Sequence, residues 1–259
     1  MINLIQIKKI ILVSSLIITG CSTLQKTPRV SSPVGESQAL TAYDKVLKNF
    51  VTKDGAVDFN SLQKQPLDLE SYVSYVAQKK FSDFKSRESL LAHHLNAYNA
   101  LSMYTVIQKN IPVSNSGFSK VRFFFLTKME IGGSTMSLVT YESDFIRSMN
   151  EDRVHWALNC MAVSCPRLPQ KPFVAETLDK DLQNLAEEFF NSEKNVRVHA
   201  ADKKVEVSEI LKFFPKDFVP VKAPSIVEYI NLYRREKIPL DFKVEYIPYD
   251  WTINNSNRR

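Results

Sequence analysis

The chain has 259 residues, of which 44% are hydrophobic and 11% aromatic, and its formal net charge is +6. This composition supplies enough apolar side chains for a core and excludes a chain that is disordered over most of its length. Basic residues are interspersed with acidic ones and form no arginine-rich stripe, so we expect no nucleic acid partner.

The N-terminus has the pattern of a secretion signal. Lys8 and Lys9 precede an apolar run over 10–18, which is too short for a bilayer span of about 20 apolar residues but typical of a signal peptide. The sequence Ile18-Thr19-Gly20-Cys21 follows. It resembles the lipobox of bacterial lipoproteins, in which the cysteine is acylated. We therefore expect residues 1–20 to be a signal peptide and Cys21 to carry the lipid.

The expected lipid on Cys21 indicates where the protein resides. Lipoprotein cysteines carry more than one acyl chain, as a stable membrane anchor requires. Ser22, not Asp, follows the cysteine, which favours the outer membrane by the sorting rule of such lipoproteins. Residues 21–37 are rich in Ser, Thr, Pro and Lys and are predicted to form a flexible tether. We expect a domain in the periplasm or at the cell surface, with an envelope protein or a cell-wall ligand as its partner.

The remainder, residues 38–259, is predicted to be one domain of the α+β class, mainly helical with short antiparallel β-hairpins. Apolar periodicity predicts helices at 38–51, 68–79, 87–109, 139–149, 152–160, 175–191, 208–214 and 225–235. Two hairpins are predicted, one from 123–126 and 129–138 around Gly132-Gly133, and one from 196–198 and 205–207. The tail over 244–251 is expected to be extended.

Several strings of the domain carry a family resemblance. They are Val57-Asp58-Phe59, His94-Leu95-Asn96-Ala97-Tyr98-Asn99-Ala100, Gly132-Gly133, Ser137-Leu138, Glu142, Ile146-Arg147, His155-Trp156-Ala157-Leu158-Asn159-Cys160, Ser164-Cys165-Pro166-Arg167-Leu168, Tyr249-Asp250-Trp251 and Ile253-Asn254. In this order and spacing they resemble the DUF547 family, whose biochemical role is undefined, over residues 40–254. Family members usually have Phe-Trp-Ile-Asn where this chain has His93-His94-Leu95-Asn96. They often have a histidine at the position that Ser143 occupies here. The resemblance implies a fold and a candidate site, but no reaction.

Polar side chains interrupt the longest predicted helix. Asn96 and Asn99 share one face, and His93, beside His94, continues that strip. A buried amide without partners costs about 1–3 kcal/mol. Two interpretations stay open: the asparagines tie neighbouring loops to the core, or Asn96 orients a histidine or donates to an oxyanion.

With Cys21 lipidated, Cys160 and Cys165 are left as a pair. In an oxidising compartment such a pair predicts a disulfide. A continuous helix would hold the two cysteines about 8–9 Å apart, too far for a bond. Pro166 favours an extended conformation at Cys165, so the disulfide requires the chain to leave the helix after Cys160.

Two other interpretations of the pair compete with the disulfide. Cys165, or Cys160, would be a nucleophile activated by His155, with Asn96 or Asn99 orienting the imidazole. Asp250 is a second-tier candidate, as a partner of Arg147 or His155. A metal site made by the cysteines with His155 and His93 or His94 lacks the spacing of known zinc motifs, so we expect neither metal nor cofactor.

The sequence thus predicts an envelope lipoprotein whose domain is a disulfide-stabilised binding or structural module. The alternative is a thiol-dependent hydrolase or an acyl or amide transferase, with a Cys-His-Asn set that acts on peptide or cell-wall amides.

Overall fold

The computed structural model describes residues 22–28 and 34–258, so the predicted signal peptide and Cys21 lie outside the described residues. The helices are α1 (Glu36–Phe50), α2 (Phe59–Lys64), α3 (Leu67–Gln78), α4 (Arg87–Gln108), α5 (Gly117–Val121), α6 (Leu138–Tyr141), α7 (Leu178–Phe190), α8 (Ile210–Phe213), α9 (Pro215–Phe218) and α10 (Ile226–Tyr233). The strands are β1 (Thr23–Leu24), β2 (Thr127–Ile131), β3 (Ser134–Ser137), β4 (Val196–His199), β5 (Lys204–Ser208) and β6 (Lys243–Ile247). The predicted α+β class is confirmed.

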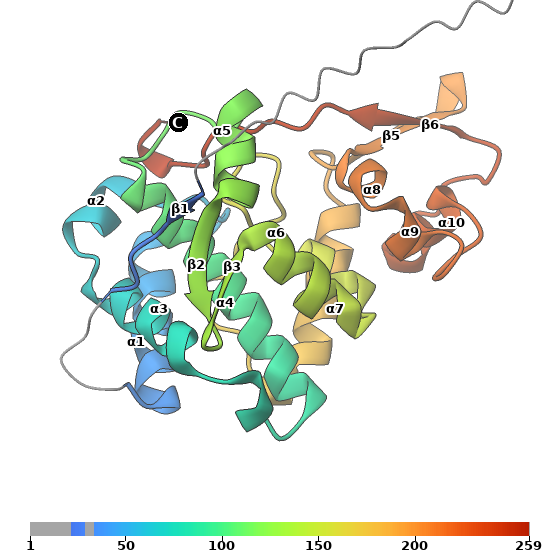
Figure 1. Cartoon of the computed structure of the whole chain (residues 1–259). Helices are drawn as coiled ribbons and strands as arrows, with labels where there is room; N and C mark the ends of the chain where they lie inside the picture. Colours follow the sequence, from blue (N-terminus) through green and yellow to red (C-terminus); the bar gives the residue numbers. More distant parts are fainter. Residues whose placement is uncertain (1–21, 29–33, 259) are drawn as a thin grey trace, which may run out of the picture.

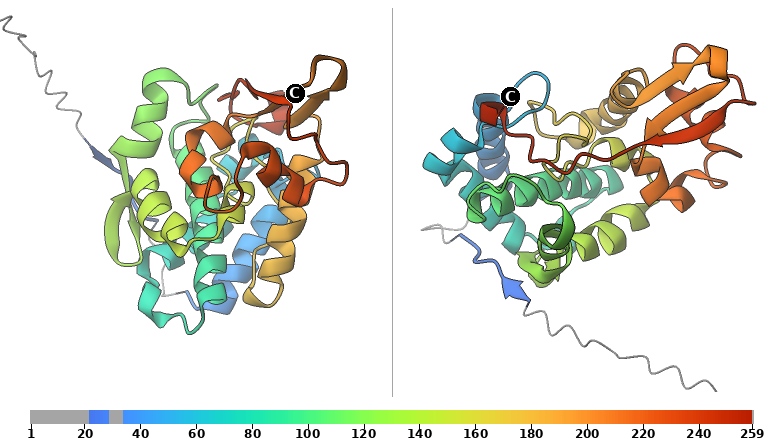
Figure 2. Two further views of the ribbon diagram at one scale, coloured as in Figure 1. Left: turned by 90° about the vertical axis from the view of Figure 1, so that its right-hand side faces the viewer. Right: turned by 90° about the horizontal axis from the view of Figure 1, so that it is seen from above.

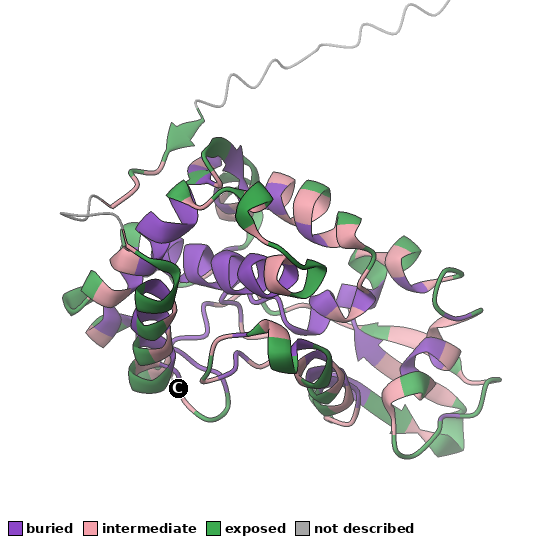
Figure 3. Cartoon of the chain, turned by 90° about the horizontal axis from the view of Figure 1, so that it is seen from below, coloured by how far each residue is buried: buried purple, intermediate pink, exposed green. Residues whose placement is uncertain are grey.

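Helix α4 is the centre of the fold. It begins at a capping box in which Ser86 and Ser89 bond each other's main chain. Every residue from Leu91 to Ile107 is buried (Figure 3), and a helix buried on all sides has little amphipathic character. Helices α2 and α3 pack against α4, and α1 packs against α3, where the rings of Tyr43 and Tyr72 stack 4.5 Å apart.

The described residues form two small three-stranded sheets, ordered β1-β2-β3 and β4-β5-β6. Both predicted hairpins are present, with Met129 opposite Met136 and Val198 opposite Val205. Each hairpin also gains a parallel edge strand, β1 or β6. The predicted antiparallel hairpins are therefore confirmed, and each belongs to a mixed sheet. Parallel partners come from distant parts of the chain, so local alternation does not indicate them.

Two segments differ from their predicted form. Residues Arg122–Leu126, expected as a strand, form a π-helical turn, η2, that continues α5. Aromatic side chains favour strands, but the turn places Phe123 in the core and leaves Phe125 half exposed. The predicted helix over 152–160 is only a 3₁₀ turn, η5 (Asp152–Trp156), and an irregular loop carries the chain onward.

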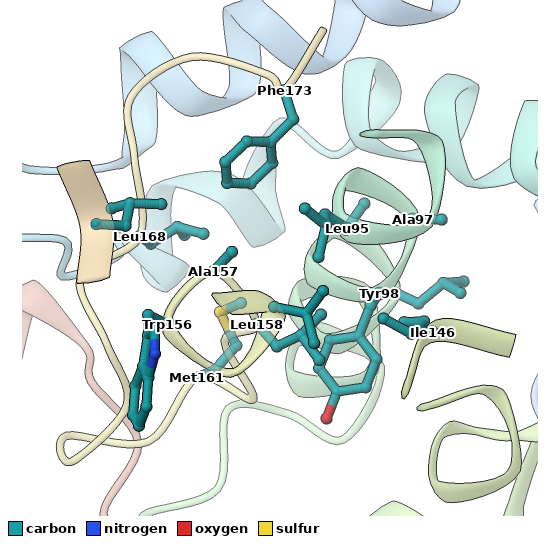
Figure 4. Packing of buried hydrophobic residues seen from close by; sticks show 14 of the residues in the cluster. Leu95, Ala97, Tyr98, Ile146, Trp156, Ala157, Leu158, Met161, Leu168 and Phe173 are labelled. Carbon is teal, nitrogen blue, oxygen red and sulfur yellow. The ribbon is translucent and has the colours of Figure 1, made fainter. Parts of the chain in front are cut away.

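The elements are arranged around α4 so that the two sheets lie on different sides (Figures 1 and 2). Helices α1–α3 lie at one end of the molecule, and the β4-β5-β6 sheet with α8–α10 lies at the other. Between them, Ala157, Leu158 and Met161 of the irregular loop pack toward α4 (Figure 4). Among the described residues, no helix combines the length and apolarity needed to cross a membrane.

Candidate active site

The irregular loop after η5 takes its shape from two asparagine side chains. Asn99 donates from Nδ2 to the carbonyl of Ala157 (3.0 Å) and accepts at Oδ1 from the amide of Asn159 (2.8 Å). Asn159 in turn donates to the carbonyl of Pro166 (2.7 Å) and accepts from the amide of Met161 (2.8 Å). These amides satisfy buried main-chain groups that no helix satisfies here. Met161 has a φ of 68°, and this turn doubles the chain back on itself.

The turn brings the two cysteines together. Their Sγ atoms lie 3.2 Å apart and are free thiols in the structure, whereas a disulfide bond measures about 2.05 Å. The disulfide therefore stays a prediction. The amide of Cys160 donates to Cys165 Sγ (3.2 Å), and the hydroxyl of Tyr249 lies 3.1 Å from the same sulfur.

These contacts make the two thiols unlike. Burial opposes ionisation of Cys165, but hydrogen bonds from the Cys160 thiol, the Tyr249 hydroxyl and the main chain outweigh it and lower the pKa to about 7. The pKa of Cys160 is raised well above its usual value, first by its hydrogen bond to Cys165 and then by burial. A thiol whose pKa is near neutral supplies the nucleophilic thiolate at physiological pH, so these contacts make Cys165 the better candidate of the two.

A second polar group faces the same place. His155 is 4% exposed, and its Nε2 lies 2.8 Å from Asp217 Oδ2. Arg147 binds both carboxylate oxygens of Asp217, at 2.6 and 2.8 Å. Burial would raise the pKa of Asp217, yet the hydrogen bonds from His155 and Arg147 hold it well below its usual value. The imidazole also stacks on Phe214 with ring centres 4.6 Å apart, so its orientation is fixed on two sides.

Glu142, from the π-helical turn η3 (Glu142–Ile146), completes the polar set. It accepts a hydrogen bond from the Tyr98 hydroxyl (3.0 Å). Burial raises the pKa of this carboxyl, and the neighbouring His155 only partly opposes the effect. Glu142 therefore keeps its proton to a higher pH than an exposed glutamate does.

The two thiols, His155 and Glu142 border one cavity of about 90 Å³. Its polar lining consists of Tyr98, Glu142, His155, Cys160, Cys165 and Tyr249, and its apolar rim includes Phe124, Phe213, Phe214 and Trp251. The cavity has room for a few non-hydrogen atoms, since one water takes about 30 Å³ of liquid. A small acyl group would fill it and leave the rest of a substrate outside.

The predicted site residues divide into two groups. His155, Cys160 and Cys165 meet at this cavity. Asn96 does not: its amide bonds both the amide and the carbonyl of Phe173, at 2.9 and 2.8 Å. The hydrogen bonds of Asn99 likewise go to main chain. The prediction that an asparagine orients the imidazole is therefore corrected, because Asp217 has that role.

The remaining candidates lie elsewhere. The expectation that Asp250 pairs with Arg147 or His155 is wrong, since both bind Asp217, while Asp250 accepts from the amide of Thr252. His94 Nδ1 lies 2.8 Å from the Tyr141 hydroxyl, and His93 lines a different cavity. Within 22–28 and 34–258, no cluster of three or more His, Cys, Asp or Glu side chains is placed to hold a metal ion.

Three side chains of the candidate site, Glu142, Asp217 and Tyr249, are not among the site residues that the sequence predicts. Glu142 and Tyr249 stood inside the strings that carry the family resemblance, so these strings contained a signal for them. Asp217 had none, since it lies 62 positions from His155 and in no recognisable motif.

Comparison with known families agrees with part of the resemblance. Residues 81–190 match the family described as "Protein of unknown function, DUF547". No curated protein and no solved structure matches the chain. The matched segment contains α4, Glu142, His155 and both cysteines, whereas Tyr249 and Asp217 lie outside it. The chain thus carries a DUF547 domain at residues 81–190, and the candidate active site is built mainly from it.

Proposed function

We propose that this protein is a thiol-dependent hydrolase or acyl transferase in which Cys165 is the nucleophile. One observation carries the proposal: Cys165 Sγ has donors at 3.2 Å (the Cys160 amide) and 3.1 Å (the Tyr249 hydroxyl) in a cavity that Glu142 and His155 also line. Hydrogen bonds to the charged form of a group favour that form. The site is therefore suited to holding a thiolate next to an acid.

In the proposed reaction, the Cys165 thiolate attacks the carbonyl carbon of an amide or ester. As the C–S bond forms, charge moves from sulfur to the carbonyl oxygen, and the Tyr249 hydroxyl beside the sulfur stabilises it. Glu142 gives its proton to the leaving nitrogen or oxygen as that bond breaks, which leaves a thioester. The Glu142 carboxylate then takes a proton from water, whose oxygen attacks the thioester and restores the Cys165 thiolate. His155, whose ring is oriented by its hydrogen bond with Asp217, is a positioning residue beside Glu142.

The proposed substrates are peptide or cell-wall amides with a small acyl group, which suits a cavity of about 90 Å³. This class follows from the expected location. We propose that Cys21 is lipidated and anchors the protein in the outer membrane, with the domain in the periplasm or at the cell surface. The support for this is the sequence Ile18-Thr19-Gly20-Cys21 after an apolar run.

A second candidate function rests on the sulfur separation of 3.2 Å. Two thiols this close need only a small movement to bond, and an oxidising compartment favours the bond. The oxidised protein would be a disulfide-stabilised module that binds an envelope protein or a cell-wall ligand without turnover. The two candidates are exclusive while the disulfide persists, because a bonded Cys165 has no thiolate.

The test uses the purified protein and p-nitrophenyl acetate, an ester whose acyl group is small enough for the cavity. We expect a burst of nitrophenol and a mass increase of one acetyl group on Cys165, located by peptide mapping. The matched variants are Cys165→Ser, which should lose the acetylation, and Cys160→Ser, which should keep it. Equal acetylation of Cys165→Ser and the unaltered protein would overturn the proposal. Cysteines that label only after reduction would support the disulfide module.

A further inference from the structure

We infer a second binding pocket, separate from the thiol site, that takes a small uncharged ring compound with a hydrogen-bonding group. The pocket is a cavity of about 180 Å³ between α3, the first turns of α4 and the chain after Phe173. Its walls include Tyr72, Tyr75, Phe84 and His93. It shares no lining residue with the cavity at Cys165, so the inference does not depend on the proposed function.

Three buried polar atoms of this lining lack a protein partner. Tyr72 is 0% exposed, His93 is 5% exposed and Tyr75 is 6% exposed. Within the part of the chain that the structure describes, the hydroxyls of Tyr72 and Tyr75 and the Nε2 of His93 form no hydrogen bond. Leaving one such group unsatisfied costs about 1–3 kcal/mol, and native proteins contain few of them. Three at one cavity indicate that a bound molecule completes hydrogen bonds there. Because these atoms have almost no solvent-accessible surface, the molecule must displace the neighbouring rings slightly to reach them.

The buried part of the wall carries no charge, and the two carboxylates of the lining, Glu36 and Glu176, are exposed to solvent. Burial, aided by His94 and Lys79, lowers the pKa of His93 to about 3, so its imidazole is neutral at pH 7. Burial also raises the pKa of Tyr72 well above its usual value, so its hydroxyl keeps its proton. Desolvating a charged ligand here would be costly without a counter-charge. In the buried part, the groups without a partner are two tyrosine hydroxyls, which donate and accept, and a neutral ring nitrogen.

The shape of the lining favours a ring. The Phe84 and His93 rings lie 4.6 Å apart, and Tyr75 meets His93 edge-on at 5.8 Å. Aromatic pairs prefer such offset and edge-to-face contacts, and a planar ligand would extend them. A cavity of about 150 Å³ is known to hold benzene, so one of about 180 Å³ has room for one ring with a substituent.

One wall of the pocket is fixed before any ligand arrives. Asn96 bonds both main-chain groups of Phe173, and this contact holds the following chain over the cavity. At the rim, Lys79 and Glu36 form an ion pair of 3.1 Å, and the Glu36 side chain is half exposed to solvent. A preformed apolar cavity with a few convergent polar groups is the usual form of a small-molecule site.

The test uses phenol as the probe and benzene as its apolar counterpart. Binding is followed by calorimetry and by the ring resonances of the histidines in the full protein. We expect phenol to bind, to shift the His93 resonances and to bind about five-fold more weakly to His93→Phe and to Tyr72→Phe, as expected for one lost hydrogen bond. Benzene binding should change little.

Tyr104→Phe is the matched control, because Tyr104 is buried on α4 but does not line this pocket. Its phenol affinity should equal that of the unaltered protein, and melting curves should show that all variants are folded. Failure of phenol to bind at millimolar concentration, or to move the His93 resonances, would overturn the inference. So would equal weakening in Tyr104→Phe. None of these results bears on acetylation of Cys165.

Discussion

The Tyr249 hydroxyl lies 3.1 Å from Cys165 Sγ, and Tyr249→Phe removes it while keeping the ring. A hydrogen bond to a charged group contributes about 1.5–3 kcal/mol, and about 1.4 kcal/mol corresponds to one pKa unit. The pKa of Cys165, about 7 in the unaltered protein, should therefore rise to about 8–9 in the variant. At pH 7 the thiolate fraction would fall from about one half to about one tenth or less.

The assay is the rate of alkylation by iodoacetamide from pH 5 to 10, with the modified peptide identified by mass spectrometry. Because only the thiolate reacts, the midpoint of the rate profile reports the pKa, and it should move to higher pH in Tyr249→Phe. Tyr246→Phe is the matched control, since Tyr246 is partly exposed on β6 and no hydrogen bond joins it to the cysteines. An unchanged midpoint in Tyr249→Phe would refute our account of the Cys165 thiolate.

Three further changes test other parts of the structure. Asn99→Ala strips two buried main-chain groups of their partners and should lower the free energy of unfolding by about 3 kcal/mol, measured by urea denaturation. The control is Asn184→Ala, since Asn184 is exposed on α7. A loss below about 1 kcal/mol in Asn99→Ala, on the order of a surface change, would contradict this expectation. Because the folded pKa of Asp217 is lowered, its carboxylate stabilises the protein above pH ~4 and this stability is lost as the pH falls. In Asp217→Asn, the free energy of unfolding should therefore fall less steeply as the pH is lowered. An unchanged dependence on acid pH would contradict the pairing of Asp217 with His155 and Arg147. Cys21→Ser should leave an unprocessed or soluble protein; if it still fractionates with membranes and is cut at the same place, the lipid anchor is wrong.

Much of the fold was predictable because local periodicity reports local structure. The bounds of α3, α4 and α7 lie within a few residues of those expected, and the hairpin of β4 and β5 has the expected pairing. The errors occur where tertiary contacts override propensity. The run Phe123-Phe124-Phe125 has the composition of a strand but follows α5 into a π-helical turn, and Phe124 packs against Trp251 from the far end of the chain.

The candidate site was predictable to a lesser degree. Short strings marked His155, Cys160 and Cys165 because these residues stand close in sequence. The partner of His155 was not predictable, since Asp217 reaches it from α9 and no spacing rule joins the two. The helical strip of Asn96 and Asn99 was recognised, but residue types alone do not distinguish an amide that orients a catalytic ring from one that holds main chain.

The two asparagines of α4 show why a buried helix carries polar residues at this position. Each presents one donor and one acceptor, which match the amide and carbonyl groups of an irregular segment. Asn99 holds the chain at Ala157 and Asn159, just before the cysteines, and Asn96 holds the chain at Phe173, over the second pocket. An apolar side chain at either position would leave those main-chain groups unsatisfied, at a cost of about 1–3 kcal/mol each. The rigid helix therefore determines the position of two loops that could not hold their own shape, and both cavities depend on it.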